Sequence, residues 1–183
     1  YGTANSFVVD TSRVIYDFSA ELLEQIRSDI SLMAKKLNLV DGLVHTQFIR
    51  NGSSYWIIEV TRRCPGDLYS QLIELSTGYE YAAAYVKPFI NEKLSNNKTV
   101  INQSWIMRHT ISSAEEGVFG SIKFNYPVLI EKMFQLSLAG DFIKSSPFSR
   151  IGIGFFKTDT EAELRELFKL TLSRKLYKLM ESY

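Results

Sequence analysis

Residues 42–69, GLVHTQFIRNGSSYWIIEVTRRCPGDLY, are the stretch on which the interpretation of this chain depends. Two segments typical of β-strands flank the turn signal Asn51-Gly52-Ser53. The second segment runs into Arg63-Cys64-Pro65-Gly66 and then into a helical pattern. The stretch therefore predicts a β-hairpin that leads through a short loop into a helix.

Four polar side chains are expected to converge on one face of this hairpin. Glu59, Thr61 and Arg63 follow one another at intervals of two, so in an extended strand they share a face. Gln47 lies opposite Glu59 if the strands pair antiparallel. A carboxylate, an amide oxygen and a hydroxyl are oxygen ligands that suit Mg²⁺ bridging phosphate groups, and a guanidinium matches phosphate oxygens.

Two further expectations concern the surroundings of Glu59. Alternation places it on the same side as Ile57, so we expect it to be partly buried and to need either a metal or an ion pair with Arg62 or Arg63. Opposition of Gln47 and Glu59 also predicts a three- or five-residue connection around Gly52 rather than a two-residue turn.

The hairpin resembles the metal-binding hairpin of the ATP-grasp superfamily, G-x-x-H/F-x-[EQ]-F followed by I-E-[VIM]-N-x-R. The resemblance implies that Gln47, Glu59 and Thr61 bind Mg²⁺ and that Gln47, Glu59 and Arg63 contact the ATP cofactor. It further implies that Arg63 is catalytic, through its contact with phosphate. Thr61 stands where the family usually has Asn, and its hydroxyl is a shorter and poorer ligand than an amide oxygen.

The composition is that of an ordinary folded protein. The 183 residues include 45% hydrophobic and 22% charged residues, and the net charge of +1 gives no reason to expect nucleic acid or an anionic membrane as a partner. No apolar run is long enough to cross a bilayer. The single cysteine, Cys64, excludes an internal disulfide and suits a reducing compartment, which predicts a cytoplasmic protein. Because the chain starts at Tyr1 and soon enters a strand-like stretch, we interpret it as part of something longer.

Before residue 95, the pattern predicts a mixture of strands and helices. The expected elements are a hairpin of 6–10 with 13–17, a helix over 19–37 capped by Ser19, strands 43–50 and 55–61, and helices over 68–76 and 80–94, the last interrupted at Pro88.

A polar run at residues 95–98 predicts a boundary between domains 1–95 and 100–183. The second domain is expected to hold strands 103–111, 118–124, 134–139 and 151–157, a short helix near 127–132, and a final helix from Asp159 or Thr160 that includes Met180. The pattern therefore predicts an α+β protein. The resemblance implies that it consists of the antiparallel-sheet half of an ATP-grasp second subdomain and then a small α/β accessory domain with a long C-terminal helix. This order resembles the domain that follows the ATP-grasp module in amino-acid ligases and carbamoyl-phosphate-synthetase-like proteins.

Other polar residues carry weaker signals. His45 shares the face of Gln47, but a lone histidine is more often a packing residue than a ligand. Asp67 is expected to cap the following helix. Cys64 lacks the neighbouring histidine of a nucleophile, and His109 shows no partner pattern in the sequence.

The resemblance implies a ligase that uses ATP and Mg²⁺ to join a small-molecule carboxylate to an amine or similar nucleophile through an acyl phosphate. The chain alone is expected to be inactive. Two alternatives stay open: a non-catalytic ATP-grasp descendant that binds nucleotide or a partner, which Thr61 favours, and an α/β scaffold without a site. The oligomeric state, the carboxylate and the nucleophile are not predicted.

Overall fold

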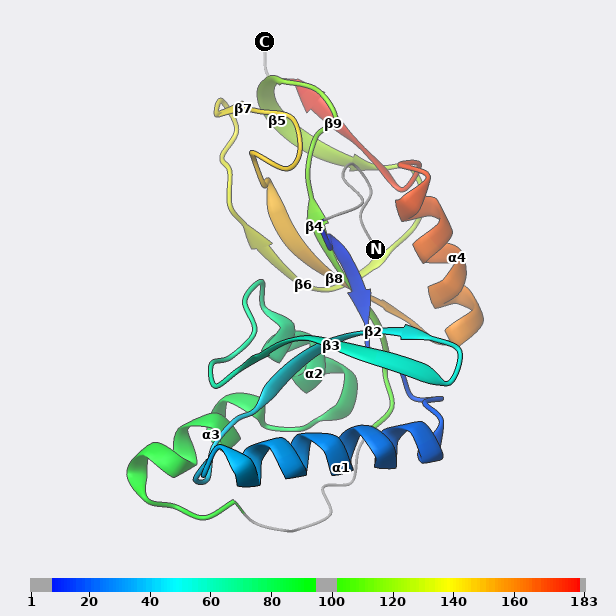
Figure 1. Cartoon of the computed structure of the whole chain (residues 1–183). Coiled ribbons are helices and arrows are strands. Elements are labelled where there is room, and N and C mark those ends of the chain that lie inside the picture. Colours follow the sequence, from blue (N-terminus) through cyan, green and yellow to red (C-terminus); the bar gives the residue numbers. More distant parts are fainter. Residues whose placement is uncertain (1–7, 95–101, 182–183) are drawn as a thin grey trace. The chain divides into compact units, whose positions relative to one another are not determined.

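The structure is a computed structural model that describes residues 8–94 and 102–181 (Figure 1). In chain order, its elements are β1 (Thr11–Arg13), α1 (Ala20–Lys36), β2 (His45–Asn51), β3 (Ser54–Thr61), α2 (Tyr69–Thr77), α3 (Tyr81–Val86), the 3-10 helix η1 (Lys87–Ile90), β4 (Trp105–Ile111), β5 (Gly117–Phe124), β6 (Leu129–Gln135), β7 (Phe142–Ile143), β8 (Gly152–Thr158), α4 (Glu161–Leu172) and β9 (Tyr177–Glu181). All strand pairs are antiparallel. The α+β class is as predicted.

The described residues form two compact units. Those within Ile15–Gln71 and Tyr79–Val100 make up the hairpin unit, and those within Tyr1–Val14, Leu72–Gly78 and Ile101–Tyr183 make up the sheet unit. The boundary expected at residues 95–98 lies outside the described residues, so the division into 1–95 and 100–183 stays a prediction. None of the helices described is long and apolar enough to cross a membrane.

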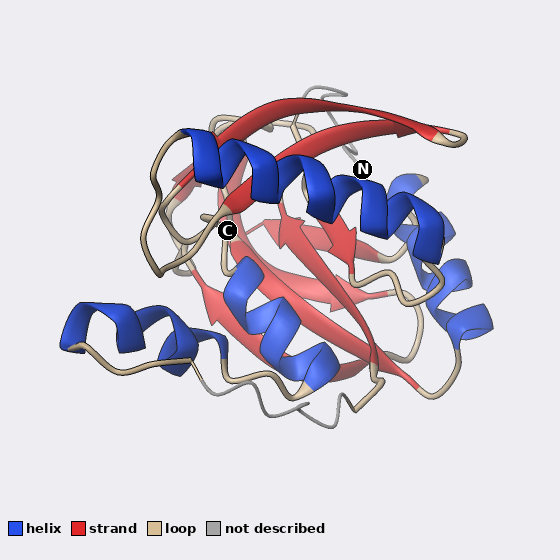
Figure 2. Ribbon diagram, turned by 60° about the horizontal axis from the view of Figure 1, so that its bottom comes forward, coloured by secondary structure: helices blue, strands red, loops and turns tan. Residues whose placement is uncertain are grey.

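In the hairpin unit, α1 lies beside the two strands β2 and β3 (Figures 1 and 2). The Ser19 hydroxyl accepts a hydrogen bond from the Leu22 amide, which caps the helix as predicted. Leu22 and Ile26 are its buried residues. Further along, Pro88 stands in the 3-10 turn η1, so the helical segment expected over 80–94 is divided where the sequence indicates.

The sheet unit contains a four-stranded sheet in the order β1-β4-β8-β6 and a three-stranded sheet in the order β7-β5-β9. The core consists of buried apolar side chains from these strands, from α4 and from the residues just before β8 and β9: Met107, Ile111, Phe119, Ile143, Ile151, Phe156, Leu164, Leu167, Phe168 and Leu176. Gly152 and Gly154 of β8 allow a close approach of neighbouring atoms. A Cβ atom at Gly152 would lie 2.9 Å from the Phe134 carbonyl oxygen.

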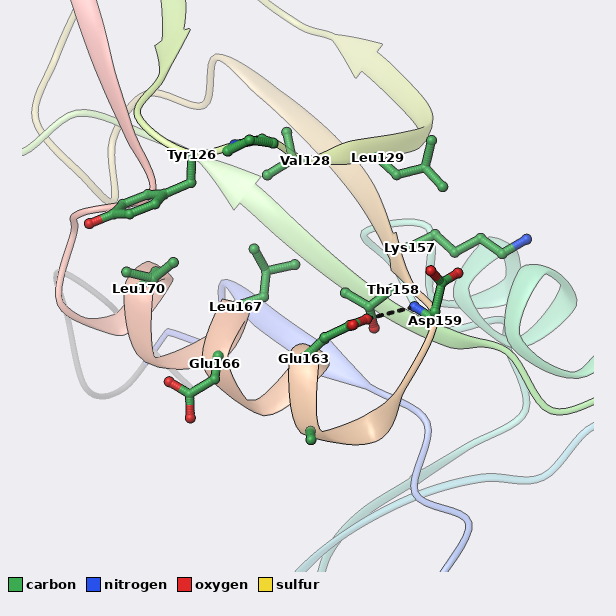
Figure 3. A pocket seen from close by; sticks show the side chains of 12 residues that line it. Tyr126, Val128, Leu129, Lys157, Thr158, Asp159, Glu163, Glu166, Leu167 and Leu170 are labelled. Atoms are coloured by element: carbon green, nitrogen blue, oxygen red, sulfur yellow. Dashed lines mark hydrogen bonds between the residues drawn. The ribbon is translucent and has the colours of Figure 1, made fainter.

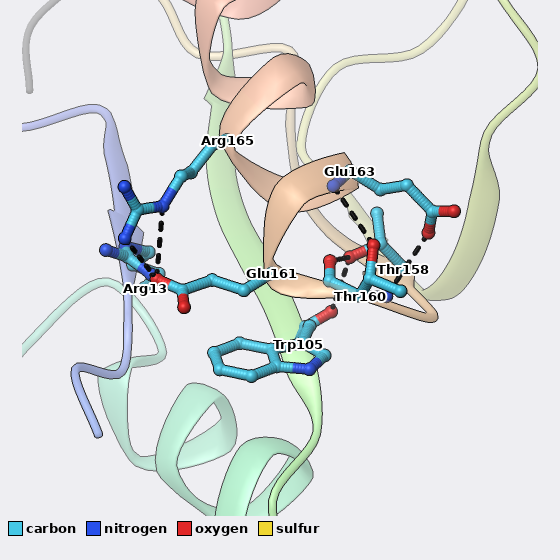
Figure 4. A network of polar contacts seen from close by, with 7 residues as sticks. All are labelled: Arg13, Trp105, Thr158, Thr160, Glu161, Glu163 and Arg165. Carbon is cyan, nitrogen blue, oxygen red and sulfur yellow. Dashed lines mark hydrogen bonds and ion pairs between the residues drawn. The ribbon is translucent and has the colours of Figure 1, made fainter. Parts of the chain in front are cut away.

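Polar contacts fix the start of α4 against β1 (Figure 4). Of the two starts expected for the final helix, Asp159 and Thr160, Thr160 is the cap: its hydroxyl accepts from the Glu163 amide, and the Glu163 side chain accepts from the Thr160 amide. Glu161 accepts from Arg13 and from Arg165, each at 2.9 Å. These hydrogen bonds, Arg13 first, lower the pKa of the Glu161 carboxyl.

Four expected elements are wrong. The strand expected over 134–139 is one of them, because β6 ends at Gln135 and residues 136–139 form a loop. Thr11–Arg13 does not join a local hairpin but pairs with β4. This partner strand is far away in the sequence, so no local sequence pattern predicts the pairing. The short helix expected over 127–132 is replaced by β6, which begins at Leu129. The final helix ends at Leu172 and does not include Met180, which belongs to β9.

A buried polar network crosses the sheet unit. The His109 ring is 1% exposed, with Nδ1 2.8 Å from the Thr11 hydroxyl and Nε2 3.0 Å from the Tyr177 hydroxyl. Thr11 in turn donates to an Asp10 carboxylate oxygen at 3.1 Å. These contacts suit a neutral imidazole that donates from Nδ1 and accepts at Nε2. Burial lowers the pKa of His109 to about 4, and the histidine for which the sequence showed no partner therefore has two.

Candidate functional site

The hairpin brings Gln47 and Glu59 directly opposite each other. Their Cα atoms are paired in the antiparallel ladder of β2 and β3, and His45 is paired with Thr61. Paired residues point to the same face of a sheet, as do residues two apart, so all four side chains share one face. The pairing predicted from the spacing of Gln47 and Glu59 is confirmed.

The turn that produces this pairing is shorter than expected. Asn51 pairs with Ser54, so the connection is a two-residue turn, and the prediction of a three- or five-residue loop is wrong. A β-bulge compensates: Phe48 pairs with Ile57 and Gln47 with Glu59, which leaves Ile58 as the extra residue. A two-residue turn plus one bulge residue shifts the register as an odd loop would.

The bulge also reverses the expected environment of Glu59. Because Gln47 and Phe48 point to opposite faces, their partners Glu59 and Ile57 do too. Glu59 is exposed rather than partly buried. The expectation that Glu59 shares a face with Ile57 is wrong, since simple alternation does not hold across a bulge.

The opposite face of the hairpin packs on α1. Phe48 makes edge-to-face ring contacts with Phe18 and with Tyr55, at centroid distances of 6.4 and 6.0 Å. Tyr55 donates a hydrogen bond to Asp29 of α1. One face of the hairpin is thus occupied by the unit's own helix, whereas the face that carries Gln47 and Glu59 is exposed at both residues.

Neither neighbouring arginine pairs with Glu59 among the residues that the structure describes. Arg62 donates to the carbonyl oxygens of Val40 and Asp41, both at 3.0 Å, so it holds the chain that enters β2. Arg63 donates to the Cys64 carbonyl at 3.2 Å. The ion-pair alternative for Glu59 is therefore wrong within the described part of the chain.

Gly42 has a role that the sequence analysis missed. Its φ of +141° disfavours other residues, and a Cβ atom there would collide with the Arg62 guanidinium. Arg62 therefore packs directly on the backbone of Gly42 while it binds the two preceding carbonyls. A glycine shortly before a strand, with an arginine just after the partner strand, is the only sequence signal of this contact.

The Thr61 hydroxyl and the loop after Arg63 both have unusual local geometry. The Thr61 hydroxyl accepts a hydrogen bond from the Arg63 amide at 3.3 Å. Asp67 and Leu68, just before α2, both have positive φ, at 55° and 59°. Two successive residues with side chains in the left-handed region are uncommon and store strain, which is found most often at functional loops.

The donor set fits a hard cation in part. Glu59 offers a carboxylate with no internal partner in the described residues, and Gln47 offers an amide oxygen across from it. No group of three or more His, Cys, Asp or Glu side chains that could hold a metal occurs within residues 8–94 and 102–181. A site with so few protein oxygens suits Mg²⁺ bound together with phosphate and water, not a metal enclosed by protein alone.

No family model matches the chain, and no curated protein matches its sequence. Solved structures do match. Phosphoribosylglycinamide synthetase from Anaerococcus prevotii superimposes with a TM-score of 0.74 at 19% identity, over 94% of this chain and 45% of that one. L-amino acid ligase from Bacillus licheniformis gives 0.71 at 17% identity, over 95% and 44%.

The chain has the fold of the ATP-grasp enzymes. The biotin carboxylase domain of Hydrogenobacter thermophilus 2-oxoglutarate carboxylase, solved with MgADP and bicarbonate, also matches, with a TM-score of 0.60 at 16% identity over 89% of this chain. This chain spans less than half the length of each of these ATP-grasp chains.

Proposed function

We propose that this chain is the C-terminal part of an ATP- and Mg²⁺-dependent ATP-grasp ligase. The ligase would join a small-molecule carboxylate to an amine or similar nucleophile. The observation that carries the proposal is the Gln47–Glu59 pair, which the bulge at Ile58 turns to the exposed face of the hairpin. The fold shared with ligases and a carboxylase supports it.

In this proposal Glu59 is the main protein ligand of Mg²⁺, and Gln47 supports it through its amide oxygen. The metal would supply charge neutralisation of the phosphates when bound. Glu59 is suited to this role because its carboxylate is exposed and is not engaged by Arg62 or Arg63. Thr61 follows on the same face and would complete the set, either directly or through water.

Arg63 would bind the transferring phosphoryl group. A guanidinium has five N–H donors in a planar fork that matches phosphate oxygens, and the guanidinium of Arg63 donates to the Cys64 carbonyl through Nη1. In the reaction, a carboxylate oxygen attacks the terminal phosphorus of ATP and ADP leaves. The amine nitrogen then attacks the acyl carbon and gives up one proton to solvent, the C–O bond to phosphate breaks, and inorganic phosphate departs. Arg63 would stabilise the negative charge that moves between these groups.

A specific observation favours a second candidate, a non-catalytic ATP-grasp module that binds nucleotide or a partner. Thr61 replaces the asparagine of the family pattern, and its short hydroxyl already accepts a hydrogen bond from the Arg63 amide. A metal site weakened in this way would favour binding over turnover.

ADP release from the longer protein to which we assign this chain separates the two candidates. The assay would use MgATP with a panel of amino acids as carboxylate and amine. We expect Glu59→Gln to lower the rate at least about 100-fold, as expected for the loss of one strongly stabilising group. Glu92→Gln is the matched control, because Glu92 is an exposed carboxylate in the same unit. No turnover with any substrate, together with MgATP binding that depends on Glu59, would favour the second candidate.

The isolated chain offers a further test. The resemblance implies a nucleotide held between two subdomains, so this chain alone should bind MgATP no tighter than about millimolar, near −4 kcal/mol. Calorimetry on the purified chain measures this value. Micromolar affinity would mean that the chain carries a complete nucleotide site, against the proposal.

A further inference from the structure

A hollow of about 530 Å³ opens in the sheet unit between α4, the end of β8 and the segment that joins β5 to β6 (Figure 3). Its lining is largely apolar, from Val128 and Leu129 on one side and Leu167 and Leu170 of α4 on the other. Leu167 is buried at 8% exposure, while Leu129 remains 59% exposed. The volume lies within the range of pockets that bind small molecules, about 300–1,000 Å³.

Charged side chains lie along the hollow, and most of them are already engaged. Lys157 pairs with Glu131 at 3.8 Å. Glu166 pairs with Lys169 at 2.6 Å. Glu163 accepts from the amides of Asp159 and Thr160 as part of the helix cap.

Asp159 is the exception. Its amide donates to Glu163, but within the described residues its carboxylate has neither an ion pair nor a hydrogen bond. It sits where β8 ends and α4 begins, and Figure 3 places it beside the hollow. The hollow thus combines an apolar interior with one unengaged negative charge at its edge.

We propose that this hollow binds a small molecule with an apolar body and a single protonated amine. The apolar body would cover Leu129 and the α4 leucines, and removal of such apolar surface from water favours binding. The ammonium group would lie against the Asp159 carboxylate. An anionic ligand is disfavoured, because carboxylates outnumber the single cation in the lining and that cation is paired.

The hollow is built entirely from the sheet unit, whereas Gln47, Glu59 and Arg63 belong to the hairpin unit. The ligand is therefore proposed as additional to the substrates of the ligase. Its binding can be measured without any assay of ATP turnover.

Phenethylamine and its neutral analogue phenethyl alcohol are suitable probes, followed by backbone amide chemical shifts of the whole chain during titration. Both should shift the amides of residues 126, 128, 129 and 157–170. The amine should bind about three- to five-fold more tightly, as expected for one exposed charge pair. Asp159→Asn should remove this difference and leave the affinity for the alcohol unchanged.

Two matched pairs of variants test the location. Ala162→Trp places a large ring at an exposed position in the lining and should block both probes, whereas Leu172→Trp, on α4 outside the lining, should block neither. Glu115→Gln removes an exposed carboxylate elsewhere in the sheet unit and should preserve the preference for the amine. Equal affinity for amine and alcohol in the parent chain, an unchanged preference in Asp159→Asn, or shifts outside the hollow would each overturn the proposal.

Discussion

The buried network of the sheet unit and the Gln47–Glu59 pair of the hairpin unit lie in opposite environments. In the sheet unit, His109 and Thr11 are buried and Tyr177 is partly buried. The hydroxyl groups of Thr11 and Tyr177 each hydrogen-bond the His109 ring, so the fold itself satisfies these polar groups. In the hairpin unit, Gln47 and Glu59 face each other across two strands but are exposed. A buried polar group must be satisfied internally or it destabilises the protein. An exposed pair held at fixed register serves no such need, which is why the hairpin and not the histidine network is the candidate for chemistry.

The largest expected effect is a loss of stability, and it distinguishes the buried His109 network from the exposed Gln47–Glu59 pair. His109→Ala should lower the free energy of unfolding by about 3 kcal/mol or more, because it leaves a cavity and removes one hydrogen bond from each of the Thr11 and Tyr177 hydroxyl groups. Glu59→Gln, at an exposed position, should change it by less than about 0.5 kcal/mol. Urea denaturation of this chain measures both. Similar losses for the two variants would remove the distinction between the regions.

Stability should also depend on pH through His109. Burial lowers the pKa of this histidine to about 4 in the folded chain, against an ordinary value of 6.5. Between these values the unfolded chain binds a proton that the folded chain does not, so stability is complete above pH 6.5 and falls as the pH drops towards 4. The total loss is about 3 kcal/mol.

Unfolding free energies measured across this pH range test the effect. The slope contributed by His109 should be missing in a His109→Gln variant that still folds. A parental slope that persists in that variant would assign the pH dependence to other groups. Glu59→Gln should leave the slope unchanged.

A smaller effect, on the rate of ADP release, tests whether Arg63 of the hairpin unit binds phosphate. Arg63→Lys in the longer protein should lower the rate of ADP release about ten-fold, because an ammonium cannot make the bidentate contact of a guanidinium. The control is Arg27→Lys on α1, where the arginine is 67% exposed and only weakly paired with Glu24. A parental rate in Arg63→Lys would make this arginine structural.

The smallest expected change is a gain. Thr61→Asn restores the amide oxygen of the family pattern on the face that carries Glu59, so the Mg²⁺ concentration for half-maximal activity should fall by about two- to five-fold. A change of Ser53 to Asn at the hairpin turn, away from that face, should have no such effect. A higher Mg²⁺ requirement in Thr61→Asn would mean that the hydroxyl is the better fit in this chain.

The sequence was sufficient where the signals were local. Ser19 and Thr160 marked the two helix caps, and the spacing of Gln47 and Glu59 gave the correct pairing. The sequence was not sufficient to predict the exposure of Glu59, because two local features compensate for each other in the register of the hairpin. The two-residue turn and the bulge at Ile58 together mimic an odd loop, so the partner of Glu59 was predictable but its exposure was not.

Non-local contacts account for the other errors. Nothing near Thr11–Arg13 indicates that these residues pair with β4. Leu176, Leu179 and Met180 continue the helical spacing of α4, but Arg174, with φ of 56°, ends the helical path before them. In β9, Tyr177 and Leu179 face the core and alternate with exposed residues. The His109 network was invisible for the same reason, since its partners are 98 and 68 residues away.

The extra residue at Ile58 has a consequence for how this site can change over time. Side chains along a strand alternate between the two faces of the sheet. One inserted residue therefore moves every residue after it to the opposite face. Loss of Ile58 alone would keep Glu59, Thr61 and Arg63 in the chain but turn Glu59 and Thr61 towards α1. Gain or loss of a single codon between Asn51 and Glu59 should therefore be far more damaging than most substitutions there. The site is encoded as much by the length of the hairpin as by the identity of its residues.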